Sequence, residues 1–190
     1  MAALPATIGR TVLVDAQGIN MNSAHIVGLT IASLACVTDL RTRRIPNLLT
    51  FGAALAGFLY QFVSGGIDGL GHATLGWLVG AAIFILPFTL GGLGGGDVKL
   101  LAALGAWLGP GDVFWLSLYT GVAGGVMALV VSGIYGYLAT AIQNVKLLLC
   151  HWRVAGIEAV PAITLENSSG PRLAYAFPIL TGMVATTWLR

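Results

Sequence analysis

The sequence predicts an all-α fold, a polytopic membrane helical bundle of about six transmembrane helices. Of the 190 residues, 57% are apolar and only 8% are charged, whereas a typical soluble domain has about 25% charged residues. The mean hydropathy is +0.89, and the apolar residues form runs close to the length that crosses a bilayer. Nine basic and seven acidic residues cannot make a water-facing surface for this chain, so lipid must cover most of it.

Six apolar runs are the expected spans. They cover residues 23–38, 48–63, 73–90, 97–109, 113–138 and 173–189. At about 20 residues per membrane helix, these runs occupy most of the chain, so we expect one membrane-embedded domain over residues 23–190. Residues 1–22 hold no apolar run of signal-peptide type and are expected to form a flexible N-terminal segment.

The short run 97–109 decides the topology. At 1.5 Å per residue it covers about 20 Å, whereas the hydrocarbon core is about 30 Å thick. If it crosses, seven of the nine Lys and Arg residues lie in the cytoplasm, and otherwise five do. The positive-inside rule favours crossing, with both termini outside and outer loops at 64–72 and 109–112. The cytoplasmic loop 139–172 is then expected to contain an interfacial helix over 145–154.

Glycine is abundant, with 27 residues. The pairs Gly76/Gly80 and Gly121/Gly125 have the small-xxx-small spacing that lets membrane helices approach closely. Both pairs are therefore predicted to lie at contacts between helices.

Several kinds of chemistry have no support in the sequence. Two cysteines build neither a disulfide framework nor a CxxC zinc site, and the three histidines lack the HExxH spacing of zinc hydrolases. Neither a GxSxG nucleophile elbow nor a phosphate-binding glycine motif is present. Because no basic patch exists either, we expect no nucleic-acid partner, and we expect no metal ion or cofactor.

Two acidic residues need another explanation, because carboxyl groups at membrane depth are rare. Asp39 ends the first span and Asp97 begins the fourth, and the topology puts both on the cytoplasmic side. Taken singly, Asp39 is explained by pairing with nearby arginines, and Asp97 by capping the fourth helix. Pro46 then marks the turn into the second span, and Asn47 is the predicted N-cap of that span.

Taken together, Asp39 and Asp97 predict an acid and base pair. Two carboxyl groups brought close at a partly desolvated depth cannot both ionise readily, so they share one proton. Such a pair activates a water molecule against a peptide carbonyl without a metal or a covalent intermediate.

The run Gly91–Gly96 has five glycines in six residues. It permits close approach by another chain, so Gly94, Gly95 and Gly96 are predicted to shape a substrate site by backbone contact. Lys99 is either a partner of the substrate or of an aspartate, or a cation that snorkels to the membrane surface.

The sequence resembles the bacterial type IV prepilin peptidases, membrane aspartyl proteases of the GxGD class. One family motif is matched by Asp39–Asn47, with the sequence DLRTRRIPN, and the other by Gly94–Leu100, with the sequence GGGDVKL. The resemblance covers about residues 26–136. It extends more loosely over 172–182, where Tyr175 and Pro178 resemble a family Pro-Tyr stretch.

The resemblance implies that Asp39 and Asp97 are catalytic and remove the short basic leader of a pilin precursor at the cytoplasmic face of the bacterial inner membrane. The residues expected to bind substrate or shape the site are Gly94, Gly95, Gly96, Lys99, Arg41, Pro46 and Asn47. Longer members also N-methylate the new terminus with a cytosolic segment that often carries paired CxxC motifs. This chain is similar to the short tight-adherence (Flp) pilus type, so we expect peptidase activity alone.

Two other classes of function stay open from the residues alone. One is a small cation-coupled transporter whose glycine-broken region binds the ion through Asp97, although no repeated half is evident. The other is a non-catalytic component of a pilus or secretion machine. Cleavage of a prepilin that depends on both aspartates would separate the peptidase from both alternatives.

Overall fold

Helices make up almost all of the described structure. The computed structural model describes residues 13–14, 20–21, 23–156 and 174–190. Its helices are α1 (Ser23–Thr42), α2 (Asn47–Thr89), α3 (Gly95–Ile134), α4 (Leu138–Ala155) and α5 (Ala176–Leu189). Two short strands, β1 (Leu13–Val14) and β2 (Asn20–Met21), pair antiparallel before α1. The predicted all-α class is confirmed, while most of the segment expected to be flexible, 1–22, lies outside the described residues.

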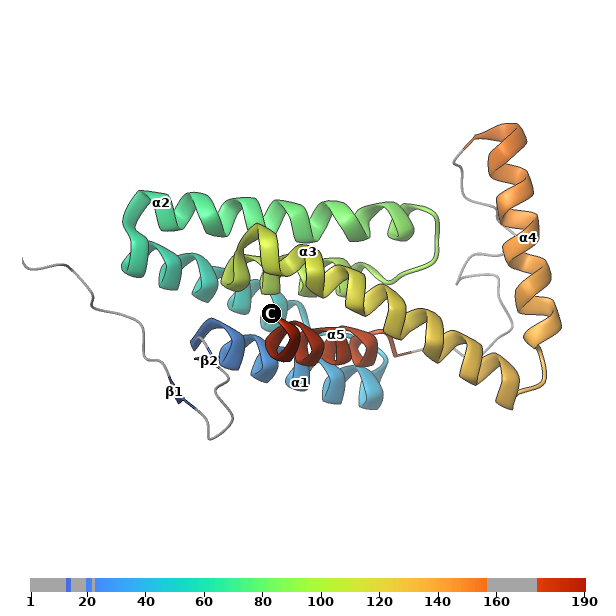
Figure 1. Ribbon diagram of the computed structural model, residues 1–190, viewed down its shortest axis with the longest axis horizontal. Coiled ribbons are helices and arrows are strands. Elements are labelled where there is room, and N and C mark those ends of the chain that lie inside the picture. The colour runs from blue at the N-terminus through green and yellow to red at the C-terminus, as the bar shows by residue number, and fades with distance from the viewer. Residues whose placement is uncertain (1–12, 15–19, 22, 157–173) are drawn as a thin grey trace, which may run out of the picture.

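The two longest helices each double back on themselves. Gly66 interrupts α2 with φ of 61°, and Gly109 interrupts α3 with φ of 80°, a backbone region that glycine enters without steric cost. Pro110 then begins the second half of α3. The first positions of a helix tolerate proline because a backbone N–H there would have no partner within the helix. With α1 and α5, the four halves run back and forth along one axis (Figure 1).

These tight reversals correct the predicted loops. Residues 64–72 and 109–112 were expected to be outer loops, but they are helical apart from Gly66 and Gly109. A single glycine with positive φ is enough to turn each helix, so no longer connection is needed. The expected span 113–138 is also too long, because α3 ends at Ile134, just before Gly136 with φ of 74°.

The outer surface of the bundle is apolar. By length and composition, α1, α2 and α3 can each cross a membrane, and α5 is a shorter apolar helix. Large side chains such as Leu48, Ile67 and Val122 are more than 60% exposed, which a soluble monomer rarely tolerates over a wide area. The chain is therefore a membrane protein.

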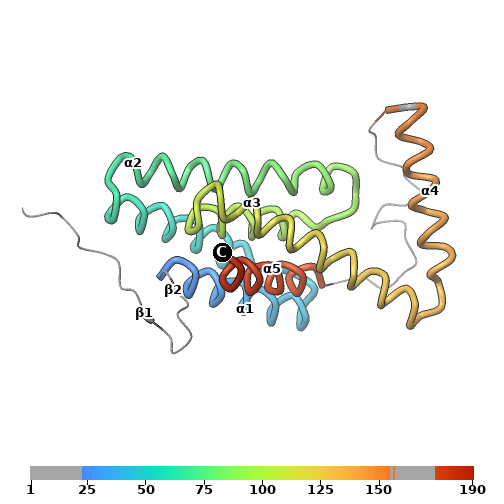
Figure 2. The backbone as a smooth tube through the Cα atoms, viewed as in Figure 1, coloured from blue at the N-terminus to red at the C-terminus, as the bar shows by residue number. Residues whose placement is uncertain are grey.

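Helix α4 departs from the direction of the other helices. It lies across the bundle axis beyond one end of the molecule (Figures 1 and 2). The predicted helix 145–154 falls within it. The rest of the predicted cytoplasmic loop, from 157 on, lies outside the described residues up to 173.

The first half of α3 forms the centre of the bundle. Every residue from Leu100 to Leu108 is buried. The Trp107 indole N–H donates a hydrogen bond to the carbonyl of Ala53 at 2.8 Å, and its ring stacks on Tyr60 with 5.2 Å between centroids. The Gln61 side chain donates to the Trp107 carbonyl at 2.9 Å. These contacts fix the central helix against the first half of α2.

The second half of α2 packs on this central helix through glycine. A Cβ atom at Gly80 would lie 2.6 Å from the carbonyl oxygen of Leu101, and one at Gly76 would overlap the backbone of Gly105. The prediction that Gly76 and Gly80 lie at a helix contact is therefore confirmed.

The second predicted pair is wrong for this chain. Gly121 and Gly125 are exposed, and a Cβ atom at either would meet no described atom within 4 Å. The glycine that packs is Gly124, which faces Tyr175. Sequence spacing alone does not fix the rotation of a helix that is apolar on all sides.

Adding one methyl group at Gly80 tests this packing. We expect Gly80→Ala to lower the free energy of unfolding by about 1–3 kcal/mol, because the backbone of Leu101 must move to make room. The matched control is Gly121→Ala, which adds the same group at an open position. Thermal unfolding in detergent measures both, and equal melting temperatures for the two variants would contradict the close contact.

Candidate active site

The end of α1 carries Asp39, which is only 8% exposed. Its Oδ2 atom accepts a hydrogen bond from the backbone N–H of Ala176 at 3.3 Å. Ala176 is the first residue of α5, and the first N–H groups of a helix have no partner within it. The Asp39 carboxyl group therefore lies at the positive end of the α5 dipole. This contact differs from the arginine pairing that the sequence left open.

The first turn of α3 carries Asp97, which is also 8% exposed. It is the third residue of the helix, so the prediction that Asp97 is the N-cap is wrong, because the helix starts two residues earlier within the glycine run. The N-cap is Gly94, whose N–H donates to Asp97 Oδ2 at 3.2 Å. This return bond is half of a capping box, and it fixes the direction of the carboxyl group.

The two carboxyl groups meet at one end of the bundle. The last turn of α1, the first turn of α3 and the start of α5 all lie at the end nearest α4 (Figure 1). Asp39 and Asp97 lie close enough to interact electrostatically, although 58 positions separate them in the chain. The structure thus brings together the two residues that the Lys and Arg pattern assigned to one side of the membrane.

Tyr175 forms a wall of this site. It precedes Ala176 and lies close enough to Asp97 to interact with it electrostatically. Its ring meets that of Phe84 edge to face, with 5.9 Å between centroids. On another side it packs on Gly124, where a Cβ atom would lie 2.7 Å from the tyrosine Oη. The tyrosine therefore links α2, α3 and α5 next to the aspartates.

The connection between α1 and α2 borders the site. Pro46 is the N-cap of α2, in agreement with its predicted place at the turn. Asn47 is the first helical residue, so its prediction as the N-cap is wrong. Its side chain instead accepts a hydrogen bond from Lys99 Nζ at 2.9 Å, and the ammonium group lies 5.4 Å from the centre of the Phe51 ring. Lys99 thus joins α3 to α2.

The glycines before Asp97 allow close packing around it. A Cβ atom at Gly94 would lie 3.2 Å from Asp97 Oδ2, and one at Gly96 would lie 3.3 Å from the Cβ of Ile45. Gly95 faces the ring of Phe88, at 3.4 Å. Because these glycines have no side chains, the α1–α2 connection and the Asp97 carboxyl group lie close to the backbone of the glycine run.

Some members of the site left no clear signal in the sequence. The donor to Asp39 is a backbone N–H of Ala176, which any residue except proline supplies. Phe84 and Gly124 belong to apolar runs in which many residues look alike. Arg41, which was predicted to belong to the site, is exposed, and its role there stays a prediction.

The arrangement suits acid and base catalysis on a water molecule. Each carboxyl group is buried and oriented by one backbone N–H. Two neighbouring carboxyl groups can divide the roles of acid and base on one water molecule. Among the described residues, no three His, Cys, Asp or Glu side chains gather in a way that could hold a metal ion.

Cross-linking tests whether the two aspartates meet. In a background where Cys36 and Cys150 are replaced by alanine, we expect the double variant Asp39→Cys/Asp97→Cys to be joined by a short bifunctional thiol reagent. Mass spectrometry of the digested protein identifies the linked peptides.

The control places the second cysteine at the other end of the bundle. Asp112 lies 3.6 Å from His25 in the first turn of α1, so Asp39→Cys/Asp112→Cys should not be linked by the same reagent. Equal linking of the two pairs, or linking of the control alone, would contradict the described site.

Comparisons with known proteins identify the family of the chain. Residues 26–129 match the model of the type IV leader peptidase family. Prepilin leader peptidase/N-methyltransferases are similar in sequence: the protein of Pectobacterium carotovorum subsp. carotovorum is 33% identical over 116 residues, covering 57% of this chain and 41% of that protein. The protein of Burkholderia pseudomallei (strain K96243) is 36% identical over 111 residues, covering 54% and 36% respectively.

The match to these relatives is partial. The protein of Neisseria gonorrhoeae is 34% identical over 100 residues, covering 48% of this chain and 34% of that protein, so this chain spans less than half the length of each of these relatives. No solved structure matches the chain. The family match covers more than half of this chain and includes both aspartates. The chain belongs to the type IV leader peptidase family.

Proposed function

We propose that the protein is a membrane aspartyl endopeptidase that removes the short basic leader from prepilin or pseudopilin precursors at the cytoplasmic face of the inner membrane. The observation that carries the proposal is the meeting of Asp39 and Asp97, two buried carboxyl groups from separate helices. It occurs in a chain of the leader peptidase family, and membership alone does not say which residues react.

The reaction follows from the paired carboxyl groups. The ionised member removes a proton from a water molecule as the water oxygen attacks the scissile carbonyl carbon, and the protonated member donates its proton to the carbonyl oxygen. The resulting tetrahedral intermediate breaks its C–N bond, and the departing amine takes up the proton that the base removed from water. One hydroxyl group of the intermediate becomes the new carbonyl and returns its proton to the carboxylate that had donated one, so both aspartates regain their starting states. The hydrogen bonds from Ala176 and Gly94 hold the two carboxyl groups in place for these transfers.

The helix lengths favour a site within the membrane, a short distance below its cytoplasmic surface. The first half of α3, residues 95–108, is about 21 Å long, less than the hydrocarbon thickness of about 30 Å. If Gly109 turns at the outer surface, Asp97 lies below the cytoplasmic surface. Six crossings with both termini outside agree with this placement and with the Lys and Arg pattern.

The substrate reaches such a site from the bilayer. A pilin precursor has a basic leader followed by an apolar helix, so its helix can stay in lipid while the leader faces the cytoplasm. The extended segment between them can bond to the backbone of the glycine run that ends at Gly96. The proposed reaction uses no cofactor, and it does not include N-methylation.

Replacing each aspartate by asparagine tests the proposal. Membranes that contain Asp39→Asn or Asp97→Asn should process a prepilin at least about a hundredfold more slowly, because the acid and base pair is lost. Immunoblotting of the shortened product measures the rate. The matched control, Asp68→Asn, changes an exposed aspartate and should process at the wild-type rate.

A folding control makes the result decisive. Asparagine keeps a side-chain oxygen that accepts the hydrogen bond from Ala176 or Gly94, so both variants should keep the wild-type melting temperature. Wild-type processing by both folded variants would contradict the assignment. Ion uptake into vesicles that requires Asp97 without peptide cleavage would favour a transporter instead.

A further inference from the structure

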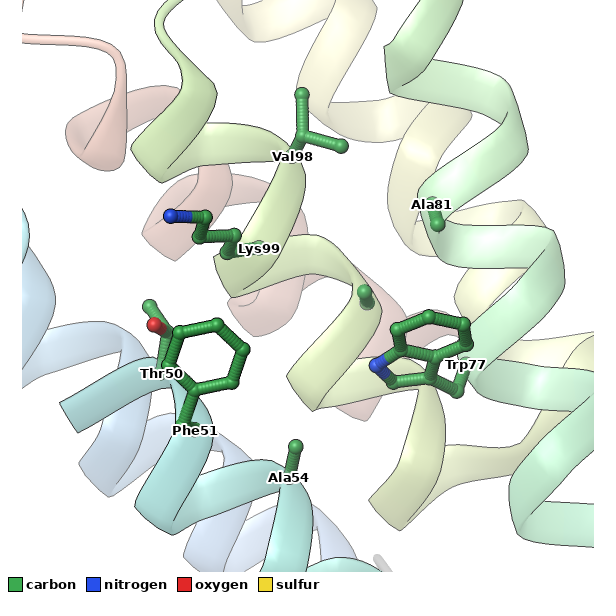
Figure 3. Close-up of a pocket in the computed structure, with 8 residues that line it drawn as sticks. Thr50, Phe51, Ala54, Trp77, Ala81, Val98 and Lys99 are labelled. Atoms are coloured by element: carbon green, nitrogen blue, oxygen red, sulfur yellow. The ribbon is translucent and has the colours of Figure 1, made fainter. Parts of the chain in front are cut away.

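A narrow apolar slot opens on the outer surface between α2 and α3. Its cavity volume is about 190 Å³. Phe51 and Trp77 stand on opposite sides of it, and alanines lie between them (Figure 3). Phe51 is 60% exposed and Trp77 is 37% exposed, so the slot faces the surroundings of the bundle rather than its core.

The size of the slot limits what it holds. Sites for whole small molecules have volumes of about 300–1,000 Å³, so this slot accommodates one chain or one side chain. Its floor is formed by alanines from both halves of α2 and from α3, namely Ala54, Ala81 and Ala102. The small methyl groups leave a groove that suits a flexible, unbranched apolar chain.

One end of the slot is positively charged. Lys99 lines it, and neither of the ion pairs among the described residues involves this lysine. Its ammonium group donates one hydrogen bond to Asn47 and lies over the Phe51 ring. Because an ammonium group has three donors, two stay available for an anion at this end.

The slot lies on a different face of α3 from the proposed catalytic pair. Successive helix residues are about 100° apart, so Lys99 and Ala102 point roughly 140–160° away from Asp97. Asp97 faces α1 and α5, where Asp39 lies. A peptide held at the aspartates therefore does not enter this slot by the same path.

We propose that the slot binds an anionic phospholipid of the cytoplasmic leaflet, with the phosphate at Lys99 and one acyl chain between Phe51 and Trp77. In the predicted topology Lys99 lies near the cytoplasmic end of α3, from which its long side chain can reach toward the headgroups, and the slot runs from it toward Trp77, which lies deeper along α2. This charge and shape match a phosphate followed by an apolar chain. The proposal does not rest on the peptidase activity, although Lys99 is also one of the residues expected to bind substrate or to shape the peptidase site.

Native mass spectrometry tests the site with defined lipids. The purified full-length protein in detergent is titrated with phosphatidylglycerol or with phosphatidylcholine, and the bound fraction is measured. We expect Lys99→Gln to weaken phosphatidylglycerol binding about fivefold, as expected for one lysine near a lipid phosphate. Ala81→Leu, which fills the slot, should weaken binding of both lipids.

Matched controls separate the slot from the general surface. Lys146→Gln removes an exposed cation from α4, and Ala56→Leu adds the same side chain at an exposed position of α2 outside the slot. Both should bind phosphatidylglycerol as the wild type does. Thermal unfolding checks that Ala81→Leu is folded. If it is not, Lys99→Gln still tests the site, because Lys99 is exposed.

Three results would overturn the proposal. Equal binding of the two lipids by the wild type would show that the site does not recognise an anionic headgroup. If the slot variants bind phosphatidylglycerol as the controls do, the lipid is not bound in the slot. A prepilin peptide that displaces one lipid molecule per peptide from the wild type, but not from Ala81→Leu, would assign the slot to the substrate instead.

Discussion

The close contact between the backbones of α2 and the first half of α3 supports the rest of the structure. A Cβ atom at Gly80 would come within 2.6 Å of the Leu101 carbonyl oxygen, so only glycine permits this separation. In lipid, helices gain little from hiding apolar surface, and van der Waals packing of small residues holds them together. Because of this contact, a short helix can be buried on all sides and still carry a polar residue at its tip.

That central helix gives the molecule two different faces. On one, Asp97 meets Asp39, and the surrounding contacts come from the starts of two helices, through the N–H groups of Gly94 and Ala176. On another, Lys99 and Ala102 border the slot that opens between α2 and α3. In the proposed account, peptide chemistry occurs on the first face and lipid binding on the second, so that one rigid element positions both.

The sequence predicts the fold class and the catalytic candidates because both predictions follow from the small number of charged residues. Charges are few, so their placement indicates the membrane, its orientation and the two unexplained aspartates. The rest depends on helix rotation and backbone geometry. In a lipid-covered bundle the core and the outside are both apolar, so periodicity cannot tell Gly124 from Gly121. The hydrogen bond from Ala176 has no side-chain signal at all, and the reversal at Gly66 needs one glycine where a loop was expected.

Mass spectrometry of the products that the purified protein forms from a prepilin is the sharpest test of cleavage by the two aspartates. Two products are expected, whose masses sum to that of the precursor plus one water, with the cut between the basic leader and the apolar helix. The products should form in the presence of a metal chelator, because the two carboxyl groups suffice. An uncut precursor with folded enzyme, or a cut within the apolar helix, would contradict the account.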